Sequence, residues 1–342
     1  MPAECTIVTI RVIRLLPGLV ACAAIAALGQ AAAAWPPLAH LGFGALTLAI
    51  ALGIVVGNLL PGHWHAPTAA GASLCQRSLL RLGVALFGLH LTLQQVLAVG
   101  PDGVLTDVIV IAGVLALALL VGVRGLGLDR DTALLVATGS AICGAAAVMA
   151  AEPVVRAPPH KVAVAVATVT LFGTAAIFVY PLLYPWLGMD DAHYGIYVGS
   201  TVHEVAQVVA AAGSVSLASA DQAVIVKLIR VLLLAPFLLL LARINGGASA
   251  AGARRTMVPG FVLAFVVVVA INSLGCLPAS VRTVLLVADG WLLALAMAAL
   301  GWNTRAAMLR DAGLRPIALG AALFAFLTGG GWAINRCVAW LI

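Results

Sequence analysis

Two apolar runs of membrane length are interrupted by the stretches GSAICGAA, residues 139–146, and GSTVHEVAQ, residues 199–207. Glycine and small hydroxyl residues allow a helix to break inside a membrane. The broken ends then present free backbone N–H groups and a positive dipole end. Transporters hold their substrates at such breaks, near the bilayer midplane. The two stretches therefore predict two discontinuous helices that meet at mid-membrane.

The residues around these breaks are the candidate substrate contacts, because free N–H groups, hydroxyls and cations all favour an anion. The predicted substrate-binding residues are Gly139, Ser140, Ala141, Cys143, Gly144, Gly199, Ser200, Thr201, Lys227 and Arg230. The last two stand three apart and share one helix face. Two cations one turn apart either snorkel to the membrane interface or hold an anion between them. The sequence leaves both interpretations open.

The second stretch also carries candidates for proton or ion coupling. His203 and Glu204 cost several kcal/mol in lipid, which indicates a polar cavity, and a histidine titrates near neutral pH. The i, i+3, i+7 spacing of Ser200, His203 and Gln207 predicts one shared helix face. The alternative role is a hydrogen-bonded tether between helices.

The string HEVAQ at 203–207 nearly matches the HExxH zinc motif, but glutamine replaces the second histidine. Zinc takes imidazole, thiolate or carboxylate ligands, so an intramembrane metal-dependent hydrolase is only a remote alternative. Six cysteines show no paired spacing, and we expect no disulfide framework, no metal and no cofactor.

Composition excludes a water-soluble protein. Of 342 residues, 63% are hydrophobic and only 9% are charged, and the mean hydropathy is +1.15. We therefore expect one all-α, polytopic transporter domain over residues 1–342 in the lipid bilayer. The net charge is +6, and the basic residues behind it lie mainly in the loops between apolar runs. They therefore indicate the membrane topology rather than a nucleic-acid partner.

About eleven runs are long enough to cross ~30 Å of hydrocarbon at ~1.5 Å per residue. They lie near 15–34, 41–60, 78–99, 104–123, 132–155, 162–187, 194–213, 223–242, 257–276, 284–301 and 316–341. The predicted first half covers about 15–187 and the second about 194–341, as inverted repeats. Single polar residues in or beside these runs, Asn272, Asp289 and Asn303, are expected to tether helices.

Basic loop residues place the N-terminus in the cytoplasm. Two topologies stay open for the broken runs at 132–155 and 194–213. Either both span the membrane, or both are re-entrant hairpins that enter from opposite faces. Only the second topology places Lys161 inside and the acidic pair Asp190 and Asp191 outside.

Four stretches resemble the YeiH-like UPF0324 family of bacterial membrane proteins, which is also labelled a sulfate exporter family: RLGVALFGL at 81–89, TGSAICGAAA at 138–147, VHEVAQVVAA at 202–211 and VKLIRV at 226–231. The likeness runs from Pro17 to the C-terminus. Glu204 stands where the family pattern leads us to expect aspartate, which keeps the carboxylate but lengthens it.

The resemblance implies crossing discontinuous helices, as in cation:proton antiporters and bile acid symporters, and a place in the bacterial inner membrane. It implies export of sulfate or a related sulfur oxyanion rather than catalysis. The alternative is a proton- or sodium-coupled carrier of a small organic anion, with His203, Glu204 and Gln207 as the coupling site. The sequence leaves homo-oligomerisation open.

Overall fold

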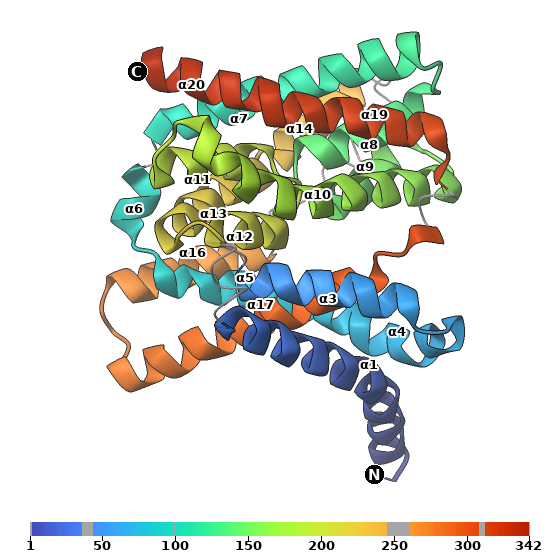
Figure 1. The fold of residues 1–342 in the computed structure, drawn as a ribbon, viewed down its shortest axis with the longest axis vertical. Helices are drawn as coiled ribbons and strands as arrows, with labels where there is room; N and C mark the ends of the chain where they lie inside the picture. The colour runs from blue at the N-terminus through green and yellow to red at the C-terminus, as the bar shows by residue number, and fades with distance from the viewer. Residues whose placement is uncertain (1, 36–43, 99, 245–259, 308–311, 342) are drawn as a thin grey trace. The chain divides into compact units, whose positions relative to one another are not determined.

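The computed structural model describes residues 2–35, 44–98, 100–244, 260–307 and 312–341, and within these ranges the chain is helical without a strand (Figure 1). The expected all-α membrane architecture is confirmed. The chain divides into two compact units. The first comprises Met1–Leu93 and Ala264–Ala306, and the second comprises Gln94–Leu263 and Ala307–Ile342. Each unit therefore combines segments that are distant in the sequence.

Fewer helices than expected are long enough to span a membrane. Five described helices qualify: Arg14–Ala34, Gly103–Gly125, Pro159–Leu187, Ala279–Asn303 and Leu314–Leu341. The number rises to seven if each of two bent pairs, Ala45–Leu59 with Gly62–His90 and Leu217–Leu232 with Pro236–Arg243, counts as one span. The expected count of about eleven is not confirmed, partly because the runs at 132–155 and 194–213 are each divided into two short helices.

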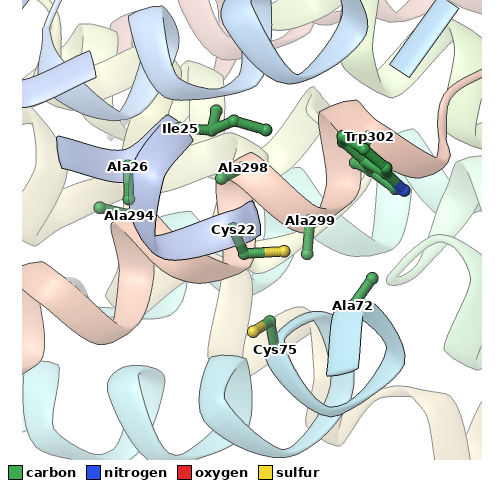
Figure 2. Packing of buried hydrophobic residues seen from close by; sticks show 9 residues of the cluster. All are labelled: Cys22, Ile25, Ala26, Ala72, Cys75, Ala294, Ala298, Ala299 and Trp302. Atoms are coloured by element: carbon green, nitrogen blue, oxygen red, sulfur yellow. The ribbon is translucent and has the colours of Figure 1, made fainter. Parts of the chain in front are cut away.

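The first unit is built on close helix crossings. Its elements are α1 (Pro2–Ala34), α3 (Ala45–Leu59), η1 (Gly62–Trp64), α4 (His65–Leu74), η2 (Cys75–Leu79), α5 (Leu80–Phe87), η3 (Gly88–His90), most of α16 (Gly260–Ser273) and α17 (Ala279–Asn303). A Cβ at Gly18 of α1 would lie 2.7 Å from the backbone N of Ala72. The small residues around this crossing, with Ile25 and Trp302, form the buried cluster in Figure 2. Such contacts drive helix association in membranes.

Polar tethers join the helices of this unit, as the single polar residues predict. Asn272 donates to Leu91 O at 2.8 Å, and Asn303 donates to Gln76 Oε1 at 2.8 Å. The tether role of these two asparagines is confirmed. Asp289 lies 3.7 Å from the imidazole that ends η3, and it is buried.

The second unit contains both sequence breaks. Its elements are most of α6 (Leu93–Ala98), then α7 (Gly100–Leu117), η4 (Ala118–Gly125), α8 (Arg130–Ala141), α9 (Ala145–Val155), α10 (Pro159–Leu187), α11 (Asp191–Thr201), α12 (Val205–Gly213), α13 (Leu217–Leu232), α14 (Leu234–Ile244), α19 (Leu314–Ala325), η5 (Phe326–Gly330) and α20 (Gly331–Leu341). Figure 1 shows α19 and α20 in one line, with α20 beside α7.

The first break folds the chain back on itself. Gly139 in α8 packs against α9, since a Cβ there would lie 2.7 Å from the side chain of Val148. In a continuous helix these residues would be ~13 Å apart along the axis. Lys161, early in α10, donates to Asp129, which caps α8, at 2.6 Å. The helix α10 therefore starts beside the start of α8, and α8 with α9 forms a hairpin.

The second break repeats this arrangement. Ser219, early in α13, donates to Asp191 O at the start of α11 at 2.8 Å. A Cβ at Gly195 would meet Ser219 O, and one at Gly199 would meet Ala223 O. From the first contact to the second, the residue number rises by four on both helices, so α13 runs parallel to α11. The intervening α12 must return to the level where α11 began, which makes α11 and α12 a second hairpin.

The two hairpins enter from opposite ends of α10. That helix covers Pro159–Leu187, about 43 Å at ~1.5 Å per residue. Its start lies beside the start of α8, and its end directly precedes α11. The inward helices α8 and α11 have 12 and 11 residues, or ~17 Å each, which is about half of a ~30 Å hydrocarbon core. This geometry agrees with the re-entrant alternative.

Candidate substrate site between two helix hairpins

One lysine joins the inner ends of both hairpins. Lys227 Nζ, from α13, lies 2.5 Å from Ile142 O and 2.6 Å from Val202 O. These two residues are the C-caps of α8 and α11. A cation is stabilised at a helix C-terminus, where unpaired carbonyls form the negative end of the dipole. Lys227 is fully buried, so the snorkelling alternative is wrong for it, and its ammonium binds protein carbonyls.

The tips of the two hairpins adjoin each other. Gly144 precedes α9 with φ of 71°, a left-handed conformation that glycine adopts without strain. A Cβ at this position would lie 3.6 Å from Cβ of Glu204 and 3.8 Å from His203 O. The predicted meeting of the two breaks therefore occurs within the second unit.

The second cation, Arg230, is paired with a carboxylate that the sequence reading did not select. Arg230 Nε lies 3.0 Å from Asp107 Oδ1 of α7, and both side chains are fully buried. Burial also makes the snorkelling alternative wrong for Arg230. Neither Nη1 nor Nη2 of Arg230 has a hydrogen-bond partner among the described residues, and neither does Asp107 Oδ2. Two donors of a buried guanidinium are thus left available.

Arg230 lies about one hairpin length away from the start of α11. Ser219 is level with the start of α11, and Arg230 follows it by eleven residues on the same helix, or about 16 Å. That distance is roughly half of a ~30 Å hydrocarbon core. Tyr180 of α10 and Cys143 from the first break lie near Arg230. The guanidinium therefore sits among the broken segments.

Glu204 and Gln207 form a capping box at the start of α12. Gln207 Oε1 accepts from Glu204 N at 3.1 Å, and the Glu204 side chain accepts from the backbone of Gln207. Gln207 also packs directly against Gly173 of α10. Because α11 ends at Thr201 and α12 begins at Val205, the predicted helix face shared by residues 200, 203 and 207 is wrong.

His203 lies in the break itself and does not belong to either helix. Its side chain is buried, and Nδ1 has no hydrogen-bond partner among the described residues. The break also separates His203 from the helix that carries Gln207, so the HEVAQ string cannot present the helical i, i+4 ligand pair of a zinc protease. Within the described ranges, no group of three or more histidines, cysteines or acidic residues could hold a metal ion.

Several predicted contact residues serve helix packing. Gly139 and Gly199 are crossing points, where an added Cβ would strike Val148 and Ala223. Thr201 donates to Tyr197 O at 2.5 Å within its own helix. The other predicted residues buried at the break ends are Ser140, Ala141 and Cys143. Their role in substrate binding stays a prediction.

Ser200 links the candidate site to a nearby cavity through one hydrogen bond. It accepts a hydrogen bond from Asn335 Nδ2 of α20 at 3.1 Å. Asn335 lines a cavity of about 420 Å³ at the start of α11, together with Thr106, Asp190, His193 and Arg336. Thr106 directly precedes Asp107 in α7. The cavity walls thus include residues directly linked to both Ser200 and Asp107.

Outside the membrane-spanning segments, Asp190 is held ionised at the cavity mouth. Hydrogen bonding from the backbone N–H of His193, at 2.8 Å, lowers the pKa of Asp190. Asp190 is the N-cap of α11, where a negative charge favours the positive end of the helix dipole. The Asp190 carboxylate thereby stabilises the first turn of α11, where the second hairpin begins.

Asp107 and Asn335 are the contacts that the sequence reading missed. Asp107 had a usable signal, because it is an acidic residue within an apolar run of membrane length, and such residues are costly unless they are paired. Asn335 had none, since one amide in a C-terminal span resembles any helix tether.

The chain is similar to bacterial membrane proteins along most of its length. A family model described as "Conserved hypothetical protein 698" matches residues 17–320. A UPF0324 membrane protein of Pseudomonas aeruginosa is 47% identical over 334 residues, covering 94% of each chain. The UPF0324 inner membrane protein YeiH of Escherichia coli is 45% identical over 328 residues, also covering 94% of each chain. A UPF0324 membrane protein of Bordetella bronchiseptica is 47% identical over 308 residues, covering 88% of this chain and 96% of its own.

No solved structure matches the chain. The family model covers most of the sequence, including both breaks and all of α7 to α13. The relatives align over nearly the whole length at close to half identity. The chain is therefore a multi-pass membrane protein that belongs to the UPF0324 family.

Proposed function

We propose that the protein is a secondary transporter that exports a small anion, sulfate or a related sulfur oxyanion, across the bacterial inner membrane. One observation carries the proposal. Arg230 is a fully buried guanidinium, and its Nη1 and Nη2 have no hydrogen-bond partner among the described residues. A buried charge with unpaired donors is expensive, so its presence among two broken helices favours a ligand.

The chemistry of the site suits an oxyanion. A guanidinium presents two parallel N–H donors that match the spacing of oxygens in a carboxylate, sulfate or phosphate. The starts of α9 and α12 add the positive ends of two helices near the adjoining tips. Lys227 is already bound to Ile142 O and Val202 O. We therefore assign anion contact to Arg230, and the assembly of the hairpin tips to Lys227.

The membrane potential favours export. With the cell interior negative, a dianion that moves outward gains ~4.6 kcal/mol per 100 mV, which is twice the value for a single charge. We place the N-terminus and Lys161 in the cytoplasm and the loop at Asp190 outside, as the positive-inside rule and the re-entrant hairpins favour. The cavity beside Asp190 would then be the external approach to the site. We expect no enzymatic activity.

Uptake of radiolabelled sulfate by inverted proteoliposomes tests this function. Arg230→Gln removes two charge-assisted donors, so sulfate affinity should fall by about 10- to 150-fold, the equivalent of about 1.5–3 kcal/mol. Arg243→Gln is the matched control, because Arg243 is exposed on α14. Equal transport by wild type and Arg230→Gln, with both proteins folded, would reject Arg230 as the anion contact.

The second candidate is a proton- or sodium-coupled carrier of a small organic anion, with His203, Glu204 and Gln207 as the coupling site. The unpartnered Nδ1 of buried His203 favours it. Against it, the Glu204 side chain and Gln207 Oε1 are already used in a capping box; Gln207 Nε2 is the atom of this pair that lacks a partner among the described residues. A transport rate that is flat between about pH 5.5 and 8, the range in which an ordinary histidine titrates, would remove this candidate.

A further inference from the structure

We propose that Asp107 is an internal competitor for the transported anion. Its carboxylate occupies Arg230 when no substrate is bound, and it takes up one proton when an oxyanion replaces it. Anion binding and proton binding are then linked one to one at a single site. The inference rests on the proposed anion transport, and it assigns the proton to α7 rather than to the second break.

The pair leaves most of the guanidinium unused. Arg230 Nε and Asp107 Oδ1 are 3.0 Å apart and form an ion pair through one nitrogen, whereas Nη1, Nη2 and Oδ2 lack hydrogen-bond partners in the described part of the chain. A bidentate pair, by contrast, would use two parallel N–H donors and both carboxylate oxygens. The guanidinium thus has its fork available to a second oxyanion.

An ionised Asp107 and a bound anion are incompatible at this place. Both would lie against one guanidinium in a fully buried setting, where like charges repel strongly because the dielectric constant is low. The other cation that acts on Asp107 is Lys227, and the C-caps of two helices already bind it. Protonation of Asp107 removes the repulsion and leaves Arg230 as a free cation.

The remaining ionisable groups do not replace Asp107 in this role. Tyr180 of α10 and Cys143 of the first break lie near Arg230, but both are uncharged in their ordinary state at neutral pH. His203 of the second break also lies within electrostatic range of Arg230, but an imidazole is neutral or positive and cannot form an ion pair with a guanidinium. The Glu204 carboxylate accepts from Gln207 N at the start of α12. Arg124 at the end of η4 and Arg336 of α20 are exposed. Asp107 is therefore the carboxylate that faces Arg230 directly.

The exchange is balanced in charge and protons. In the empty state the pair carries no net charge, with Asp107 negative and Arg230 positive. Uptake of one proton neutralises the carboxylate, and the anion then pairs with the guanidinium. Release of the anion allows Asp107 to lose the proton and return to Arg230. One proton moves with each anion.

Equilibrium binding of radiolabelled inorganic sulfate to the full-length protein in detergent tests the inference, between pH 5.5 and 8.5. In wild type the Kd should rise about tenfold per pH unit above the pH at which Asp107 ionises, since one proton is bound per anion. Asp107→Asn should bind sulfate with a Kd that is independent of pH. Asp221→Asn is the matched control, a carboxylate on α13 without contact to Arg230, and it should keep the wild-type slope.

Proton uptake by wild type gives a second measurement, should Asp107→Asn fold poorly. When sulfate is added to lightly buffered protein, the protein should take up one proton from the solution for each anion bound, and a pH dye measures this uptake. A slope retained in Asp107→Asn, or sulfate binding by wild type without proton uptake, would overturn the inference and leave the proposed function standing. Absence of sulfate binding at every pH would overturn both.

Discussion

Lys227→Met should loosen the junction of the two hairpins. The ammonium makes two charge-assisted hydrogen bonds, to Ile142 O and Val202 O, each worth about 1.5–3 kcal/mol. Methionine has a similar length but no donor, so both C-cap carbonyls lose this partner. Removal of the buried charge recovers part of the desolvation cost. We therefore expect a net loss of about 2–4 kcal/mol.

Alkylation of Cys143 measures this loss at the junction itself. Cys143 is buried between Ile142 and Gly144, and a maleimide can reach it only after the tips separate. In a background where the other five cysteines are replaced, a change of about 2 kcal/mol in the opening equilibrium raises the labelling rate roughly 30-fold. Thermal unfolding in detergent should shift to lower temperature in parallel.

Lys161→Met is the matched control, because the chain contains only two lysines. Lys161 binds Asp129 and Asp131, of which Asp129 is nearly half exposed, and such surface pairs contribute about 0–1 kcal/mol. Its replacement should leave Cys143 labelling close to the rate of the cysteine background. If Lys227→Met also keeps that rate and its thermal stability, the assignment of Lys227 to the hairpin tips is refuted.

The remaining predictions concern packing and topology. Gly199→Val should destabilise the protein, because a Cβ at Gly199 would strike Ala223 O. Gly290 lies in a helix with open space around it, so Gly290→Ala should leave the free energy of unfolding unchanged or raise it by up to ~1 kcal/mol. Equal melting temperatures for the two variants would contradict the close crossing at Gly199. Cysteines placed at Asp190 and Lys161 should react with membrane-impermeant reagents from the outside and the inside respectively; labelling of both from one side would exclude hairpins that enter from opposite faces.

The positions of the breaks were predictable because the local backbone requirement is written in the sequence. Gly144 needs a left-handed conformation, and the small residues of GSAICGAA allow the helix to stop there. The fold-back was not predictable from hydropathy alone. Each run is long enough to cross the membrane either way, so only long-range contacts, such as Lys161 with Asp129, distinguish a hairpin from a span.

The roles of the two cations were not predictable, because their partners come from distant segments. Lys227 binds carbonyls of residues 142 and 202, and Arg230 faces Asp107, which precedes it by more than a hundred positions. Helical spacing showed that Lys227 and Arg230 share a face. It could not show that the Lys227 ammonium binds backbone carbonyls, whereas Nη1 and Nη2 of Arg230 stay without a hydrogen-bond partner among the described residues.

Proton linkage at Asp107 would change the energetics of export. A dianion alone gains ~4.6 kcal/mol per 100 mV when it leaves a negative interior, but one accompanying proton reduces the moving charge to a single negative unit and the gain to ~2.3 kcal/mol. The membrane potential would still drive export, whereas a proton gradient that is acidic outside would oppose it. Sulfate efflux from proteoliposomes should therefore respond to both voltage and pH, and a rate that follows voltage with twice the single-charge dependence would show that no proton moves with the anion.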